Sequence, residues 1–376
     1  MKRDGTNHRM TAFAMGAWAV LAVAPLAPAA AVAPTGRAAP VAPPRAAPKD
    51  QIFLREAPEK PLEVEVLKET ATVVEFKLGP NVQRRYNNEV LRVVFGDTPP
   101  AWREALRLLD DGKSEEALAK IEAAAGSKVR ASWFEPHSLY AKALAQHALA
   151  RGGKAGAAEQ AEAAYLSYRQ KFKDHKFYDE SAVRLAELYV EQKKADKAEA
   201  LVDPSARAKL RGKWPGEASF VMANVFRLKG NRLRALADFE QLLKNTNKKE
   251  NPELVERTRF EIGISLIENG KAAEAVKHFQ SCLAETPKGP QKPPIWAQVG
   301  LGEAFLASGQ SKAALLAFVE VSVLGFENRS AQARAWYRAG ECWEKLGKPD
   351  EAKKRFAHCA ANYPDTEWGR LSKAKG

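Results

Sequence analysis

A phrase of three residues, Gly-x4-Ala-x3-Phe, recurs four times in this 376-residue chain at nearly fixed spacing. The copies are Gly230/Ala235/Phe239, Gly270/Ala275/Phe279, Gly309/Ala314/Phe318 and Gly347/Ala352/Phe356. Successive glycines lie 40, 39 and 38 residues apart. A self-similar period of this length indicates stacked units rather than one globular core. Arrays of this kind present an extended surface to a partner and seldom carry chemistry themselves.

Each copy of the phrase predicts two helices that pack against each other. The glycine falls where one helix ends and a tight turn begins, because such a turn needs a positive φ. The alanine and the phenylalanine then lie four residues apart on one face of the next helix. Four residues before each glycine stands a large apolar residue, and seven before it a small one. The large residues are Phe226, Leu266, Phe305 and Trp343, and the small ones are Ala223, Gly263, Gly302 and Gly340.

This pattern resembles the tetratricopeptide repeat family. The last unit carries the fullest set of family positions, namely Trp336, Gly340, Trp343, Gly347, Ala352, Phe356 and Pro364. Pro287 takes the closing-proline position of the unit that contains Gly270. Three earlier stretches keep the spacing: Gly112/Ala117/Ile121, Gly156/Ala161/Tyr165 and Lys193/Ala198/Val202.

The resemblance implies a mainly α fold, a right-handed helical solenoid of about seven helix pairs over residues 99–370, within a repeat domain of residues 98–376. The units run 37 to 44 residues, longer than the usual ~34 of the family. Pro204 also interrupts the second helix of the third unit. An irregular helical bundle is the alternative.

The first 31 residues have the composition of an export signal. Lys2, Arg3 and Arg9 precede an apolar run from Met10 to about Ala24, and residues 29–31 are alanines that offer a cleavage site. The run is short for a membrane span, and an uncleaved N-terminal anchor is the alternative. Residues 32–50 are rich in Ala and Pro and are expected to form a linker. We therefore expect an exported protein of the periplasm or cell envelope, with at most peripheral membrane contact.

Residues 51–97 alternate apolar and polar side chains with a period of two, which predicts a small β unit of four or five strands. The alternating apolar sets are Leu62/Val64/Val66, Val74/Phe76/Leu78 and Leu91/Val93/Phe95. Gly79-Pro80-Asn81 marks a turn. The unit is loosely similar to the SH3-like barrels that precede helical repeats in some exported bacterial proteins. Its core is small, so we expect it to lean on the first helix.

Residue patterns for catalysis, cofactors and metals were not found in the sequence. The six histidines show no metal-ligand spacing, and no nucleophile arrangement appears. We therefore expect a non-enzymatic protein without cofactor or metal. Three cysteines are too few for a disulfide framework, although a Cys342–Cys359 bridge would suit an oxidising compartment.

The net charge of +13 raises the question of an anionic partner. No nucleic-acid module is visible, and export argues against nucleic acid. The basic residues gather in three short segments, 169–176, 207–213 and 244–249, each at a helix end or between units. A solvated surface is the simplest interpretation. Attraction to anionic envelope polymer or membrane surface is the alternative.

Protein recognition is the function that the resemblance implies. The ligand-facing positions of the family lie thirteen, ten, six and three residues before the motif glycine. They map here onto a predicted partner-binding groove made of Glu217, Phe220, Asn224, Arg227, Arg257, Phe260, Ile264, Trp296, Val299, Glu303, Arg334, Tyr337 and Glu341. Ile267, Leu306 and Glu344 take the other three ligand-facing positions of the four units. About half of all these residues are expected to be exposed, and the others to belong to the core between repeats.

Three functions follow from these patterns. The first is an exported scaffold or adaptor that binds a peptide or helix of a protein partner in the concave face of the array. The second is a binder of anionic cell-wall or membrane-surface material through the basic segments and the β unit. The third is an accessory subunit of an enzyme, which the sequence does not separate from the first. The oligomeric state is left open.

Overall fold

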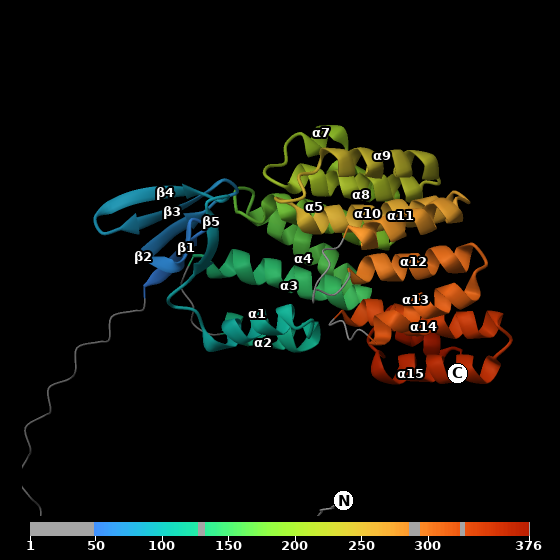
Figure 1. Cartoon of the computed structure of the whole chain (residues 1–376). Coiled ribbons are helices and arrows are strands. Elements are labelled where there is room, and N and C mark those ends of the chain that lie inside the picture. Colours follow the sequence, from blue (N-terminus) through green and yellow to red (C-terminus); the bar gives the residue numbers. More distant parts are fainter. Residues whose placement is uncertain (1–48, 127–131, 286–293, 324–327, 376) are drawn as a thin grey trace, which may run out of the picture. The chain divides into compact units, whose positions relative to one another are not determined.

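The computed structural model describes residues 49–126, 132–285, 294–323 and 328–375. The predicted signal and residues 32–48 of the predicted linker lie outside these ranges. Residues 47–376 belong to one compact unit, in which a small sheet precedes an array of helices (Figure 1). The predicted fold class, a mainly α protein with helix pairs after a small β unit, is confirmed.

Within the described residues, one antiparallel sheet of five strands makes up the β unit. The strands are β1 (Asp50–Leu54), β2 (Ala57–Glu69), β3 (Val73–Leu78), β4 (Asn81–Tyr86) and β5 (Val90–Val94). They pair in the order β4-β3-β2-β1-β5, so β5 returns to the edge of β1. Gly79, with a φ of +63°, lies in the predicted turn between β3 and β4. The strands β4 and β5 are the two edges, and the SH3-like resemblance extends only to a small sheet.

The core of the sheet follows the predicted alternation for the first set, and for the second set except at Leu78, which is 36% exposed. Val64, Val74 and Phe76 are buried together with Ile52. The third set is partly wrong, because Leu91 is exposed and Val90 is buried instead. The physical reason is a register shift between Phe53 and Leu54 where β1 pairs with β5, since a one-residue slip exchanges the two faces of a strand.

Seven helix pairs follow the sheet within the described residues, one for each predicted unit. They are α1 (Pro100–Asp110) with α2 (Ser114–Gly126), α3 (Phe134–Arg151) with α4 (Ala157–Lys171), α5 (Tyr178–Glu191) with α6 (Ala195–Val202), α8 (Trp214–Leu228) with α9 (Arg232–Asn245), α10 (Pro252–Glu268) with α11 (Ala272–Ala284), α12 (Ile295–Ala307) with α13 (Ser311–Val323), and α14 (Arg329–Lys345) with α15 (Pro349–Asn362). The short helix α7 (Pro204–Arg207) begins at the predicted interruption, where Asp203 caps it.

The motif phenylalanine fills the space that the small residue of the first helix leaves open. A Cβ placed on Gly263 would lie 2.1 Å from the ring of Phe279. The same test gives 2.6 Å between Gly302 and Phe318. Neither contact leaves room for a methyl group, so each glycine is required by the ring that covers it. The paired helices therefore meet at a Gly–Phe contact inside their own unit.

The motif glycine ends the first helix in a left-handed conformation. Gly230, with a φ of +82°, donates its N–H to Arg227, and the next residue donates to Phe226, which closes the helix end. In the third pair Lys193 takes this place with a φ of +59° and the same pattern of hydrogen bonds. Among the residues that the structure describes, Lys193 is the only non-glycine residue with a positive φ.

The replacement Lys193→Gly is expected to raise the free energy of unfolding by about 1 kcal/mol, because a left-handed backbone is strained for any residue with a Cβ. Chemical denaturation of both proteins measures the change. Lys194→Gly is the matched control, since Lys194 lies next to it outside the left-handed region, with a φ of −93°. Equal stability of Lys193→Gly and the unchanged protein would contradict the assignment of strain to this turn.

The second pair differs from the prediction at its turn. Gly153, with a φ of +73°, ends α3, whereas the predicted motif residue Gly156 precedes the first residue of α4. The turn is therefore three residues longer than the motif implies. Ala161 and Tyr165 are still fully buried, because the second helix keeps its phase.

All three cysteines are free and buried, so the suggested Cys342–Cys359 bridge is not formed. Burial raises the pKa of the Cys342 thiol to about 12. The Cys359 thiol donates to the carbonyl oxygen of Ala333 at 3.3 Å. These thiols are protonated packing residues within the helix pairs.

The chain closes with the short helix α16 (Glu367–Lys373), which packs on α14 and α15. Trp368 meets the ring of Tyr337 at 5.4 Å between centroids. Arg370 donates a hydrogen bond to the carbonyl oxygen of Gly152, at the end of α3 and 218 residues earlier. The last helix of the array therefore touches its second pair.

Candidate functional site

The first helices of the last four pairs, α8, α10, α12 and α14, carry all thirteen predicted groove residues. Consecutive members of this set contact one another. The surface that they form is called the first-helix face below. Each helix contributes residues spaced three or four apart, which places them on one side of the helix.

The structure places the predicted groove residues at two depths. Six are buried: Glu217, Phe220, Asn224, Val299, Glu303 and Tyr337. Seven are partly exposed: Arg227, Arg257, Phe260, Ile264, Trp296, Arg334 and Glu341. The partly exposed set contains two large rings and three arginines, which are side chains suited to recognition.

A pocket of about 290 Å³ brings four of the predicted residues together between α8, α10 and α12. Its apolar wall is formed by Phe220, Phe260 and Trp296, with Arg257 beside them. Three glutamates that the sequence analysis did not select complete the lining: Glu253, Glu256 and Glu261. They stand on the first three turns of α10, and nothing in the repeat pattern singled them out.

A second pocket, of about 340 Å³, continues along the face between α10, α12 and α14. Ile267 and Leu306 supply its apolar part. Glu303 and Glu341 are predicted groove residues, whereas Arg338 and Lys345 were not selected. The linings of the two pockets together hold six glutamates and three basic residues. The two pockets are thus acidic in a chain whose net charge is +13.

The arginines of the first-helix face are held by neighbouring carboxylates. Arg257 donates to Glu217 at 2.9 Å and to Glu187 at 2.7 Å, so it joins α5, α8 and α10. Arg334 donates to Glu303 at 2.7 Å and links α12 with α14. These partners satisfy the charges inside the protein and fix the aromatic residues, since Arg257 also lies 4.3 Å from the ring centroid of Phe220.

Two carboxylates of the face stay free in the described part of the chain. Glu253 and Glu256 are exposed, and neither forms an ion pair with a residue that the structure describes. They lie at the rim of the pocket that contains Phe260 and Trp296. An arriving basic group would therefore find unpaired negative charge beside an apolar surface.

The C-terminal helix covers one end of the face, which the sequence analysis did not foresee. Trp368 of α16 lies against Tyr337, and the guanidinium groups of Arg334 and Arg338 lie 5.2 and 5.3 Å from its ring centroid. Tyr337, a predicted partner contact, is consequently buried by the chain itself. The two pockets described above stay open beside this cover.

Basic residues from the three predicted segments meet in a large cleft of about 1100 Å³ between the sheet and the helix turns. Lys176, Lys213 and Lys249 come from the helical side, and Arg55 and Arg92 from the sheet. Arg211 also lines the cleft. Two of these basic residues are paired, Arg211 with Asp179 at 2.8 Å and Lys176 with Glu69 at 2.7 Å. The segments are thus brought to one place rather than spread over the surface.

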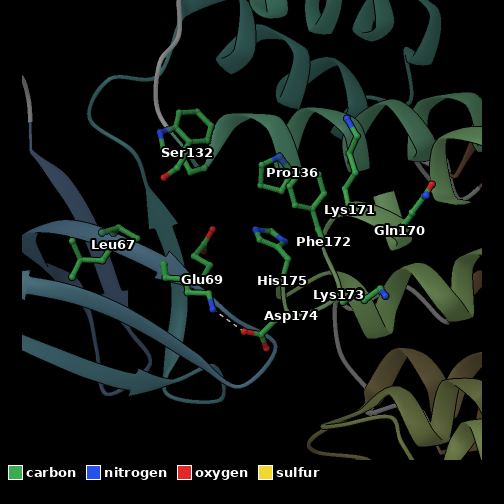
Figure 2. A pocket seen from close by; sticks show the side chains of 13 residues that line it. Leu67, Glu69, Ser132, Pro136, Gln170, Lys171, Phe172, Lys173, Asp174 and His175 are labelled. Carbon is green, nitrogen blue, oxygen red and sulfur yellow. Dashed lines mark hydrogen bonds and ion pairs between the residues drawn. The ribbon is translucent and has the colours of Figure 1, made fainter. Parts of the chain in front are cut away.

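The sheet joins the helical array at the second pair, not at the first helix as expected. Ala71 donates its backbone N–H to Asp174, and Lys68 forms an ion pair with the same residue at 2.8 Å. A pocket of about 480 Å³ opens at this junction. Figure 2 shows the carboxylate of Glu69, from the sheet, beside the ring of His175, from the helical side.

His137 completes a cluster at this junction. Its Nε2 lies 2.6 Å from Oε2 of Glu69, and the second carboxylate oxygen accepts a hydrogen bond from Lys176 at 2.7 Å. Glu69 and the two histidines come from β2, α3 and the turn before α5, so their spacing along the chain gave no signal. The sequence analysis expected no metal site, and the fold brings three potential ligands together.

Comparison with known proteins supports the repeat assignment. Residues 334–366 match the tetratricopeptide repeat family model. The match covers the last helix pair, and together with the seven helix pairs it supports a protein of the tetratricopeptide repeat type. A comparison with curated proteins finds no match.

Several solved structures are similar to this chain. A tetratricopeptide repeat protein from Parabacteroides merdae is 17% identical, with coverage of 73% of this chain and 97% of that one and a TM-score of 0.47. A Rap protein complexed with Competence and Sporulation Factor is 13% identical, with coverages of 73% and 95% and a TM-score of 0.43. A Podosopora anserina putative kinesin light chain with TPR-like repeats is 18% identical, with coverages of 52% and 95% and a TM-score of 0.37.

Arrays of this family generally serve as scaffolds for protein interaction rather than as catalysts. In the described part of the chain, no helix combines the length and the apolar character needed to cross a bilayer.

Proposed function

We propose that this protein is an exported, non-enzymatic scaffold that binds a protein partner on its first-helix face. The observation that carries the proposal is the pocket between α8, α10 and α12. It combines partly exposed rings of Phe260 and Trp296 with the carboxylates of Glu253 and Glu256, which have no ion-pair partner among the described residues. Apolar anchors beside fixed charge are the features of a peptide-binding groove.

The chemistry of the pocket selects the class of partner. Its walls suit an aromatic or aliphatic side chain, and its acidic rim attracts lysine or arginine. We infer a peptide segment in which a large apolar residue lies within a turn or two of basic residues. Tyr337 is covered by Trp368, so the partner contacts fall on α8, α10 and α12 rather than on the last pair.

Export is part of the proposal and rests on the composition of residues 1–31. A protein working in the cell envelope meets its partner there. Chain recovered from the envelope should begin at Val32, which is the residue after the alanine site.

Selection from a displayed library of random twelve-residue peptides tests the groove. Residues 32–376 are used as bait beside the variant Phe260→Ala/Trp296→Ala. Peptides that bind the unchanged bait should combine an apolar anchor with Lys or Arg, and the variant should weaken them by about tenfold or more, because each truncated hot-spot ring costs more than ~1 kcal/mol. Leu233→Ala/Leu316→Ala is the control, since both leucines are 71% exposed on second helices.

The salt dependence of the same peptides separates the groove from the basic cleft. Binding through apolar anchors should persist in about 0.5 M salt, whereas contacts to exposed Lys and Arg are screened. The second candidate function, capture of anionic envelope polymer, is favoured by the convergence of Arg55, Arg92, Lys213 and Lys249 on one cleft. Selection of acidic peptides that ignore the Phe260/Trp296 variant and dissociate in salt would reject the groove in favour of that cleft.

A further inference from the structure

Three side chains with metal-binding groups converge where the sheet meets the second helix pair. Glu69 ends β2, His137 lies in the first turn of α3, and His175 lies in the turn between α4 and α5. One potential ligand atom from each residue lies within 4.8 Å of the other two. We propose that Glu69, His137 and His175 bind one divalent transition-metal ion of the zinc class, which ties the sheet to the helical array.

The donor set indicates the class of ion. Two imidazoles with one carboxylate suit Zn²⁺ and its first-row neighbours, whereas Ca²⁺ and Mg²⁺ prefer oxygen donors throughout. Oε2 of Glu69 and Nε2 of His137 already approach to 2.6 Å. An ion at ordinary Zn–N and Zn–O distances of about 2.1 Å would need this pair to separate by less than ~1 Å.

Neighbouring groups hold the three side chains in position. The hydroxyl of Tyr168 lies 2.7 Å from Nδ1 of His175, an outer contact of the kind that orients metal-binding imidazoles. The ring of His137 is packed edge-on against Trp133 and Phe177. Thr70, next to Glu69, forms a β-bridge with His175, so the strand end and the turn are fixed together.

An ion can reach the cluster from the pocket that Glu69 and His175 line, and the same pocket leaves room for water as a further ligand. Lys176 acts against binding, because its ammonium group lies 2.7 Å from Oε1 of Glu69. A cation at Oε2 would lie close to that positive charge. The site should therefore tighten when the lysine charge is removed.

Calorimetric titration of ZnCl₂ into residues 32–376, without a histidine tag and treated with a chelator, tests the proposal. One Zn²⁺ per chain is expected, together with a rise in Tm on binding. His175→Ala and His137→Ala should each weaken binding on the order of 100-fold. Lys176→Met should strengthen it. His278→Ala/His358→Ala is the matched control, because both histidines lie elsewhere in the array, and His278 stands beside Cys282.

Substitution with Co²⁺ gives a second readout that does not depend on folding energy. Visible d–d absorption should appear in the unchanged protein and disappear in His175→Gln, the more conservative variant, whose circular dichroism reports whether it still folds. The proposal is overturned if folded protein takes up no Zn²⁺, or if binding is lost only in the His278/His358 control. Neither outcome bears on the peptide groove, which uses none of these residues.

Discussion

Replacing Phe279 with alanine is expected to lower the free energy of unfolding by about 3–5 kcal/mol, the range for a fully buried phenylalanine. The ring has no exposed surface and lies between two glycines from different pairs. A Cβ on Gly263 would lie 2.1 Å from it, and one on Gly300 would lie 2.2 Å from it. Its loss therefore opens a cavity both inside the α10–α11 pair and against α12. Chemical denaturation monitored by circular dichroism measures the change.

The reverse test fills the space instead of emptying it. Gly263→Ala should destabilise by about 1–3 kcal/mol, because the added methyl group collides with the Phe279 ring. Phe279→Leu in the Gly263→Ala background should recover part of the loss by shortening the opposing side chain. Leu316→Ala, at a residue 71% exposed, is the control and should change stability by less than ~0.5 kcal/mol. If Phe279→Ala destabilised the protein as little as Leu316→Ala does, the Gly–Phe contact would not be the basis of helix pairing.

Replacing Arg257 with leucine is expected to lower the free energy of unfolding by about 3 kcal/mol at pH 7, the low end for breaking a buried ion pair. Arg257 donates to Glu187 and Glu217, whose side chains are 9% and 10% exposed. Without it, Glu217 keeps its charge in a buried place and has lost its ion-pair partner. The loss of stability should therefore arise only while the carboxyl of Glu217 is ionised.

The pH dependence follows from Glu217. Burial raises its pKa above the ordinary value, although Arg257 opposes that rise. A carboxyl with a raised folded-state pKa stabilises the protein on the acid side and loses that contribution as pH rises. Without Arg257 the pKa rises further, so the destabilisation measured at pH 7 should shrink at pH 5. Adding Glu217→Gln to the variant should restore part of the stability at pH 7.

A surface lysine supplies the control for the arginine experiment. Lys354 pairs with Glu351 at 2.6 Å, but its side chain is 65% exposed. Lys354→Leu should change stability by less than ~1 kcal/mol at either pH, because exposed ion pairs contribute little. If Arg257→Leu behaved like this control at both pH values, the joining of α5, α8 and α10 by that guanidinium would be of no energetic consequence.

The repeat architecture could be predicted because its cause is local. The turn glycine, the small residue and the phenylalanine of a unit all lie within one pair of neighbouring helices. Their spacing is therefore fixed by helix geometry and is visible along the chain. Even the third unit, which has Lys193 in place of the motif glycine, could be predicted from Ala198 and Val202, and both of these residues are fully buried. The second pair shows the limit, since Gly153 rather than Gly156 ends its first helix.

The functional surface was predicted less completely because it depends on neighbours far apart in sequence. Phe260 and Trp296 were found from their helical phase, but the acidic rim at Glu253 and Glu256 follows no repeat position. The cover over Tyr337 comes from Trp368, beyond the last unit. The cluster of Glu69, His137 and His175 needs three separate elements to meet, and no spacing rule links them.

The hydrogen bond from Arg370 to the carbonyl of Gly152 changes how the array responds to force. In an open solenoid each repeat contacts only its neighbours, so no contact links distant repeats. Here the last helix is fastened to the second pair, and the guanidinium lies so close to Gly153 that a Cβ there would come within 2.6 Å of it. Tension on the C-terminus would act on this hydrogen bond together with the contacts of α16 on α14 and α15. Extending the array therefore requires breaking the link between its last helix and its second pair as well as the contacts between neighbouring pairs.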